Sequence, residues 1–268
     1  FNHFTYVLAG DGCLMEGISH EFASLAGHLG LSHLIVLYDD NKISIDGATS
    51  ITMSDKSLER FQSVGWHTIK IDGYDLQQID SALVKAKETS KPTLIACQTL
   101  IGYGAPNKQG TAGSHGAPLG EEEIKRAKLK MMWNYDKFEI PSKVLEHWRE
   151  IGIKNKRESE EWRKKHLKTL RYIKSKKDDL SNKLAEVREK CVELFLSQNN
   201  QIATRKSSEM VLSELDKKNL NLLGGSADLT GSNNTFVASM TRIKPKNFEG
   251  NYIHWGVREH CMAAAMNG

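Results

Sequence analysis

The chain contains 268 residues, which is enough for one or two domains with a sizeable hydrophobic core. Hydrophobic residues make up 39% and charged residues 26%, a composition that excludes collagen-like, low-complexity and disordered proteins. No run of about 18 apolar residues predicts a transmembrane helix, and no signal peptide is recognisable. The chain begins at Phe1 in a strand-like run and ends at Gly268 in a helix-like run, so we expect segments to be missing at both ends.

The net charge of +4 is concentrated in one stretch of the chain. Residues 154–190 contain 14 Lys and Arg against 7 Asp and Glu, so the remainder is slightly acidic. Because the acids are interspersed with the bases and no recognition motif accompanies them, we interpret this stretch as a solvated helical face. We therefore expect no nucleic-acid partner and no membrane partner.

The four cysteines lie far apart and form no CxxC pair, so a zinc ribbon is not predicted. Cys97 lies in an apolar strand-like run and Cys191 on an apolar helical stripe. Reduced, buried thiols are therefore favoured over disulfides, and they indicate a cytoplasmic protein.

The first half of the chain alternates predicted strands and helices. Apolar runs predict strands over residues 3–9, 33–38, 66–71 and 92–100, and helical periodicity predicts helices over 15–29, 58–64 and from Asp75 to Lys87. This order is typical of an α/β fold with a mainly parallel sheet flanked by helices. Because such sheets bind ligands at the carboxyl ends of their strands, the loops after Ala9, Tyr38 and Leu100 are candidate binding loops.

A long loop, a charged linker and a further α/β unit follow these strands and helices. Residues 102–120 are rich in glycine, and loops of this length are typically functional or disordered. We divide the chain into an α/β domain over 1–150, a helical linker over 151–200 and the start of a second α/β domain over 201–268. The last unit has predicted helices over 204–217 and from 257 onward, and strands over 220–224 and 251–254.

Two polar motifs follow neighbouring strands of the predicted sheet. Gly10, Asp11 and Gly12 follow the first strand, and Asn41 follows the second, 30 residues after Asp11. Glycines let a backbone approach a phosphate, and a following helix offers its positive end. Asp11 and Asn41 are hard oxygen ligands of the kind that Mg²⁺ prefers. The pattern therefore predicts a site for a metal and a diphosphate, although Gly-Asp-Gly alone occurs in many ordinary turns.

Six sequence blocks resemble the transketolase family, and they occur in the family's order. The block GDGCLMEGISHE at 10–21, followed by YDDNKISIDG at 38–47, closely resembles its thiamine-diphosphate motif. Four further blocks agree, IGYGAPNK at 101–108, SHGAPLG at 114–120, LGGSADL at 223–229 and GVREH at 256–260. The resemblance spans nearly the whole chain and implies a thiamine-diphosphate-binding fold.

The resemblance implies roles for residues of the first half. The Mg²⁺ ligands would be Asp11, Asn41 and the backbone carbonyl of Ile43, with Ca²⁺ or Mn²⁺ able to replace Mg²⁺. Gly12 and Asn41 would contact the diphosphate. His115 would act as a base or proton relay near the diphosphate and the substrate hydroxyls, which is work that suits an imidazole. Judged by residue type alone, His115 could equally be an ordinary loop residue.

The resemblance also implies roles for Glu16 and for residues of the second half. Glu259 would hydrogen-bond the aminopyrimidine ring of thiamine diphosphate and so activate it, and Glu16 would couple to that glutamate across a subunit interface. Arg205 and Ser232 would hold the sugar phosphate, and Asp228 would lie close to the cofactor. By residue type alone, Glu259 could be a first-turn helix acid and Arg205 a surface cation.

The implied activity is the transketolase reaction of the pentose phosphate pathway. A two-carbon ketol group would move from a ketose phosphate to an aldose phosphate through a thiamine-diphosphate ylide and a dihydroxyethyl intermediate. The implied assembly is a homodimer with active sites at its interface. Members of the family are longer at both ends, so we expect the chain alone to be inactive. The alternatives are dihydroxyacetone synthase, deoxyxylulose-phosphate synthase and a non-catalytic transketolase-like protein.

Overall fold

The computed structural model describes residues 3–198, 201–220 and 222–268. Its first half is built on a four-stranded parallel sheet in the order β1-β2-β6-β5. The strands are β1 (Thr5–Gly10), β2 (Leu34–Asp40), β6 (Thr93–Gln98) and β5 (His67–Asp72). This sheet confirms the α/β class and all four strands predicted for this half.

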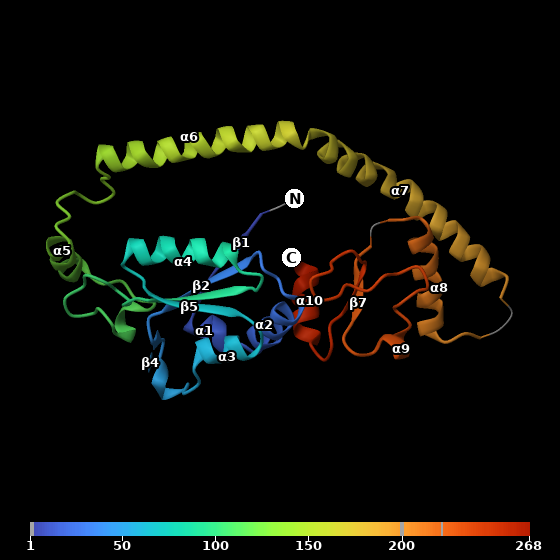
Figure 1. Cartoon of the computed structure of the whole chain (residues 1–268), viewed down its shortest axis with the longest axis horizontal. Coiled ribbons are helices and arrows are strands. Elements are labelled where there is room, and N and C mark those ends of the chain that lie inside the picture. The colour runs from blue at the N-terminus through green and yellow to red at the C-terminus, as the bar shows by residue number, and fades with distance from the viewer. Residues whose placement is uncertain (1–2, 199–200, 221) are drawn as a thin grey trace.

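Helices cover both faces of the sheet (Figure 1). On one face, α2 (Gly17–Leu29) and α3 (Ser57–Ser63) pack around a core that includes Phe61 and Trp66. On the other face, α4 (Leu76–Glu88) packs two buried alanines against isoleucines of the sheet. Cover on both faces explains why the inner strands β2 and β6 are continuous apolar runs.

The helix predicted over residues 15–29 is wrong at its beginning. Helical structure starts earlier, in α1 (Asp11–Met15), and resumes in α2 after a break at Glu16. The backbone at Glu16 is extended, with φ −59° and ψ 137°. The break separates α1, which carries Asp11 and Gly12 at the carboxyl end of β1, from the longer helix α2 that follows.

Short elements follow two of the strands, β2 and β6. β2 is followed by an antiparallel hairpin of β3 (Ile43–Ser44) and β4 (Gly47–Ala48), and then by the 3₁₀ turn η1 (Thr49–Ile51). Two-residue strands carry no alternating pattern, so the sequence does not predict this hairpin. The segment after β6 is irregular except for η2 (Ala112–Ser114) until α5 (Glu121–Lys130) begins, which confirms the long loop predicted there.

Two long helices join the halves of the chain and arch over the molecule in Figure 1. They are α6 (Ser142–Lys165) and α7 (Leu167–Leu196). The predicted linker over 151–200 is helical as expected, but its first helix begins at Ser142, inside the range assigned to the first domain. The domain boundaries themselves stay predictions.

The C-terminal unit is small. It contains α8 (Thr204–Lys217), β7 (Gly224–Ser226), α9 (Thr230–Asn233), β8 (Tyr252–His254) and α10 (Glu259–Asn267). β7 and β8 pair in parallel, which agrees with the second α/β unit predicted here.

One predicted strand of this unit is misplaced. The strand expected over residues 220–224 lies later, at Gly224–Ser226, and Asn221 is outside the described residues. A Cβ on Gly225 would lie only 2.5 Å from the carbonyl oxygen of Ile253 and 2.4 Å from Nε1 of Trp255. The strand therefore lies at the glycines, which allow β7 to approach Ile253 and Trp255 closely, and not at the leucines that precede them.

The C-terminal unit packs on α2. Leu25, Trp255 and Cys261 share a buried cluster, and the backbone N–H of Cys261 donates to Oε2 of Glu21 at 2.8 Å. Arg258 donates to the hydroxyl of Ser24 at 2.9 Å. The start of α10, where Glu259 lies, is thereby fixed beside α2.

The four cysteines are free thiols, as predicted, although Cys13 is exposed and only Cys191 and Cys261 are fully buried. Among the described helices, none has the length and apolar character needed to cross a membrane.

Candidate active site

The largest polar pocket lies at the carboxyl ends of the parallel strands, where the sequence predicts binding loops. It has a volume of about 1000 Å³ and collects residues from the ends of β1, β2 and β6 and from the long loop. Five predicted site residues line it together, namely Asp11, Gly12, Asn41, Ile43 and His115. The adjacency expected from the strand order is therefore confirmed.

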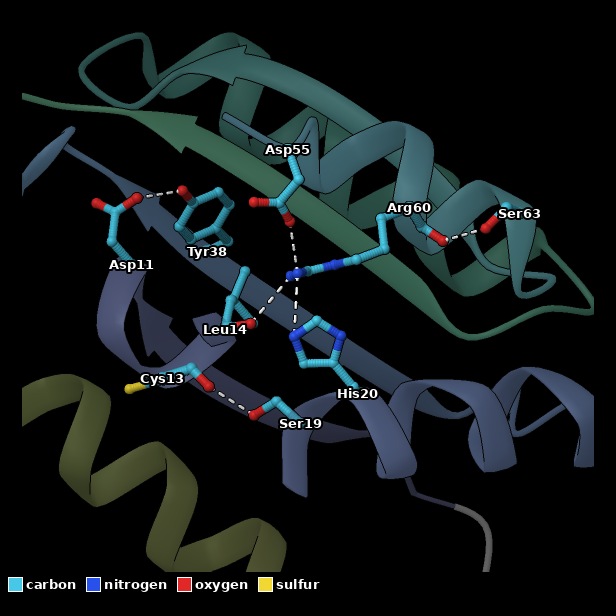
Figure 2. Close-up of polar contacts among 9 residues, drawn as sticks. All are labelled: Asp11, Cys13, Leu14, Ser19, His20, Tyr38, Asp55, Arg60 and Ser63. Carbon is cyan, nitrogen blue, oxygen red and sulfur yellow. Dashed lines mark hydrogen bonds and ion pairs between the residues drawn. The ribbon is translucent and has the colours of Figure 1, made fainter. Parts of the chain in front are cut away.

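Asp11 is a buried carboxylate at the start of α1, with 4% of its surface exposed. Tyr38 of β2 donates its hydroxyl hydrogen bond to Oδ1 of Asp11, as Figure 2 shows, and the backbone N–H of Lys42 donates to Oδ2 at 3.2 Å. Burial raises the pKa of Asp11 above its ordinary value, against the lowering effect of the Tyr38 hydrogen bond. Each oxygen of this carboxylate therefore accepts a hydrogen bond, but burial has the larger effect on its pKa.

The Asn41 side chain is oriented by its neighbours. Its Nδ2 donates to Oδ2 of Asp39 at 3.1 Å, and its Oδ1 accepts from the backbone N–H of Ile43 at 2.9 Å. Asp39 is in turn held by a hydrogen bond from the hydroxyl of Thr99 on the neighbouring strand end. These contacts fix which end of the amide is oxygen, and that oxygen retains a free lone pair.

Gly10 and Gly12 border the same pocket. A Cβ at either position would meet no protein atom within 4 Å, and neither residue has a positive φ. Neither packing nor backbone conformation within the chain therefore requires glycine. A bound molecule that approaches this backbone closely, as a phosphate would, could explain why both positions are glycine.

Arg60 of α3 holds the junction between α1 and α2 (Figure 2). Its guanidinium donates to the carbonyl of Leu14 at 3.0 Å and to Oδ2 of Asp55 at 2.7 Å, and lies 3.2 Å from Nε2 of His20. The Leu14 carbonyl is left without a helical partner by the break at Glu16, and Arg60 supplies one. This contact fixes the turn that carries Asp11 and Gly12.

His115 reaches the pocket from the long loop, directly after η2. Gly102 makes this possible, because its φ is +63° and a Cβ there would lie 2.9 Å from Cβ and Oγ of Ser114. Only glycine allows the chain beside His115 to come this close to the end of the sheet. His115 is itself exposed to the pocket.

The other predicted site residues do not line this pocket. Glu16 lies at the break before α2, and Glu259 is the first residue of α10. Arg205 lies in the first turn of α8, Ser232 in α9, and Asp228 between β7 and α9 with φ +61°. The structure therefore gathers the residues predicted to bind the metal and the diphosphate, and it places those predicted to serve the pyrimidine and the sugar phosphate outside this pocket.

Several residues that support the pocket escape sequence reasoning. Tyr38 contacts Asp11 because β1 and β2 pair with Ala9 opposite Tyr38, and such a register cannot be inferred from an apolar run. Tyr74 donates to the carbonyl of Leu100 at 3.1 Å and accepts from its N–H at 3.0 Å. Tyr38 and Asp39 both stand in the quoted block at 38–47, which was a usable signal for them, whereas Tyr74 lies in none of the quoted blocks.

The donor set fits a divalent ion that shares its coordination with a phosphate. Asp11 offers one carboxylate, Asn41 an amide oxygen and Ile43 a backbone carbonyl, which together fill only part of an octahedral shell. Within the described residues, no group of three or more His, Cys, Asp or Glu side chains could hold a metal ion. Mg²⁺ commonly binds through one or two carboxylates together with phosphate oxygens, so the residues present suit it.

Comparison with known proteins identifies the class of domain first. The family model for the thiamine diphosphate binding domain of transketolase matches residues 1–188, and the model for the transketolase pyrimidine binding domain matches residues 200–268. The chain belongs to the transketolase family.

Relatives and solved structures agree along the whole chain. The transketolases of Sinorhizobium medicae and Buchnera aphidicola (subspecies Acyrthosiphon pisum) are 42% and 46% identical to it; the matches cover 100% of this chain and 39% and 41% of those proteins. The structure of Leishmania mexicana transketolase superposes with a TM-score of 0.85 at 40% identity, covering 99% of this chain and 41% of that one. A Pichia stipitis transketolase structure in complex with sedoheptulose 7-phosphate gives 0.83 at 37% identity, with 99% and 41% covered. The chain thus spans about two-fifths of the length of these relatives.

Proposed function

We propose that the complete protein containing this chain is a transketolase, which moves a two-carbon ketol group from a ketose phosphate to an aldose phosphate. The observation that carries the proposal is the single pocket that gathers Asp11, Gly12, Asn41, Ile43 and His115 at the carboxyl ends of a parallel sheet. Membership of the family and the sugar phosphate bound in a relative's structure support the substrate class. A role in the pentose phosphate pathway in the cytoplasm follows from this activity.

The first half would hold the metal and the diphosphate. Asp11, Asn41 and the carbonyl of Ile43 would bind Mg²⁺, which would neutralise the diphosphate and fix its position. Gly12 would let the phosphate approach the backbone, since a Cβ there meets only open space. Thiamine diphosphate, when bound, supplies the carbanion chemistry, and His115 would accept or donate the proton of a substrate hydroxyl.

The second half would serve the pyrimidine ring and the sugar phosphate. Glu259 would hydrogen-bond the aminopyrimidine, with Glu16 coupled to it, and Asp228 would lie near the cofactor. Arg205 and Ser232 would hold the substrate phosphate, and Arg205 has no hydrogen bond or ion pair to another described residue that would occupy it. None of these five residues lines the pocket of Asp11, which supports a homodimer whose sites combine the halves of two subunits.

The proposal is tested by assaying the complete protein with thiamine diphosphate and Mg²⁺, using xylulose 5-phosphate as donor and ribose 5-phosphate as acceptor. Asp11→Asn should abolish transfer and weaken Mg²⁺ binding by more than the about 10- to 100-fold that is typical of lost outer-shell partners. Asp80→Asn, an exposed change on α4, is the matched control and should leave both unchanged.

Other outcomes separate the alternatives. Transfer to formaldehyde in preference to ribose 5-phosphate would identify a dihydroxyacetone synthase, and decarboxylation of pyruvate a deoxyxylulose-phosphate synthase. Absence of thiamine diphosphate binding in the complete protein would leave a non-catalytic relative.

A further inference from the structure

The loop that carries His115 is held by a buried acid on the helix that follows it. Glu123 lies in the first turn of α5 and is 8% exposed. Its Oε1 accepts the backbone N–H groups of Asn107 at 2.6 Å and Lys108 at 3.0 Å, and its Oε2 accepts the side-chain amide of Asn107 at 2.8 Å. Both oxygens of the carboxylate are thus committed to two consecutive loop residues.

Glu123 differs from the acids beside it. Glu121 and Glu122 share the first turn of α5, but they are exposed and pair with Lys137 and Lys125. Glu123 has no ion pair among the described residues, and the hydrogen bond from the Asn107 backbone is the main reason why its pKa lies below the ordinary value. An acid that served only the helix dipole would not need to be buried against a loop.

A series of hydrogen bonds connects Glu123, through Lys108, to the residues on either side of His115. The carbonyl of Lys108 accepts a hydrogen bond from the hydroxyl of Ser114 at 3.1 Å, and Ser114 directly precedes His115. The ammonium of Lys108 donates to the carbonyl of Pro118 at 3.2 Å, on the other side of His115. Lys108 therefore holds the loop on both sides of the histidine, and Glu123 holds Lys108.

We propose that Glu123 is a positioning residue for His115, which it places in the pocket through Lys108 and Ser114. The inference rests on the proposed function, because it gives His115 a task in ketol transfer. Glu123 is not a pocket residue, so it would act only by fixing the loop. Misplacement of a reacting group by about 1 Å can cost about 100-fold in rate.

The test combines Glu123→Gln with His115→Ala in the complete protein. In Glu123→Gln, the new NH2 group replaces one of the two accepting oxygens, and in either orientation of the amide it faces an N–H donor of Asn107 or Lys108. The loop should therefore loosen, and kcat/KM should fall about 10- to 100-fold. When His115 is already alanine, Glu123→Gln should cause little further loss, because residues that act as one unit are non-additive. Glu122→Gln is the matched control and should change kcat/KM by less than about 2-fold.

A rescue variant distinguishes the loss of this one contact from a general folding defect. Asn107→Asp alone places two carboxylates together and should also lower kcat/KM. The swap Asn107→Asp with Glu123→Gln restores one donor and one acceptor across the contact and should recover activity to within about 3-fold of wild type. Unchanged activity in Glu123→Gln, or losses that multiply with His115→Ala, would overturn the proposal.

Hydrogen exchange provides a readout that does not depend on activity. Amide protection at residues 107–116 should fall in Glu123→Gln and return in the swap, and unchanged protection would also overturn the proposal. If the unmodified protein transferred no ketol group, the proposed function would fail instead, together with the task given to His115. The exchange data would then still decide whether Glu123 holds the loop.

Discussion

Replacing Tyr38 by phenylalanine removes one hydroxyl group from beneath the proposed metal site. Tyr38 is 1% exposed in the core, and its only polar atom beyond the backbone donates to the buried carboxylate of Asp11. Burial raises the pKa of Tyr38 far above its ordinary value, so the hydroxyl stays protonated and donates. The ring keeps its place in the core, and the change therefore tests the contacts of the hydroxyl, which faces Asp11 and also Asp40.

The expected cost follows from the charge and burial of the acceptor. A hydrogen bond to a charged group contributes about 1.5–3 kcal/mol, and leaving a buried acceptor unpaired costs about 1–3 kcal/mol. Asp11 keeps one hydrogen bond, from the Lys42 N–H at 3.2 Å, so its carboxylate is not stripped of partners. We expect Tyr38→Phe to lower the free energy of unfolding of the metal-free protein by about 2 kcal/mol at pH 7.

The loss depends on pH in a defined direction. The folded-state pKa of Asp11 already lies above its ordinary value of 3.8, and losing the Tyr38 hydrogen bond raises it further. At pH values where Asp11 is ionised, its buried charge therefore lowers the free energy of unfolding. The destabilisation by Tyr38→Phe should be complete above the pKa of Asp11 in the folded variant and should shrink as pH falls through it.

Urea unfolding of the metal-free complete protein at several pH values measures this effect, and calorimetric titration with Mn²⁺ and thiamine diphosphate measures its consequence for the site. Loss of a residue that orients a metal ligand should weaken metal affinity about 10- to 100-fold. Tyr6→Phe is the control, because Tyr6 lies in the same sheet, is 48% exposed and shares no hydrogen bond with a described side chain. Equal effects of the two changes, or a Tyr38→Phe loss that grows toward acid pH, would refute the reasoning.

Three further substitutions test separate parts of the structure. Asp11→Asn should not lower the unfolding free energy of the metal-free protein at pH 7, because it removes a buried charge whose pKa is raised; a clear loss in urea titration would contradict this. Leu94→Ala, at a fully buried position in β6, should cost about 2–5 kcal/mol in the same titration, and a loss below about 1 kcal/mol would deny it a core position. Gly102→Ala should lower kcat/KM for the ketose donor, because a Cβ at φ +63° meets Ser114; wild-type kinetics would show that the loop adapts.

The parts of the fold that depend on local chemistry could be predicted from the sequence. The strands of the sheet are apolar runs bounded by polar residues, and helices on both faces require that pattern. Asp75 begins α4 as expected, since its carboxylate accepts hydrogen bonds from the N–H groups of Gln77 and Gln78 at 2.9 and 3.1 Å. Parallel strand order then brings Asp11 and Asn41 to one edge without further information.

The parts that depend on distant contacts could not be predicted. The sequence predicts one helix over residues 15–29 and no helix before it, and the break at Glu16 is stabilised by Arg60, which lies more than 40 residues away in α3. The bond between Tyr38 and Asp11 requires the register of β1 against β2. Among the described residues, Glu259 does not line the pocket of Asp11, so the spacing of these two residues in the sequence does not bring them together within one chain.

The clearest evidence for a ligand lies where residues 10–16 depart from what folding alone would favour. Asp11 is a buried carboxylate with a raised pKa, where a neutral residue would cost less. Gly12 lies inside α1 although alanine would fit and would stabilise a helix by about 0.5–1 kcal/mol. The helical segment that begins at Asp11 then breaks at Glu16, which interrupts its run of backbone hydrogen bonds. Departures from local sequence preference cluster at functional sites. Here Asp11 and Gly12 border one pocket, and the break at Glu16 lies at the end of the short helix that carries them. The proposed phosphate and metal ion would account for the buried charge and the bare backbone at once, which no contact among the described residues does.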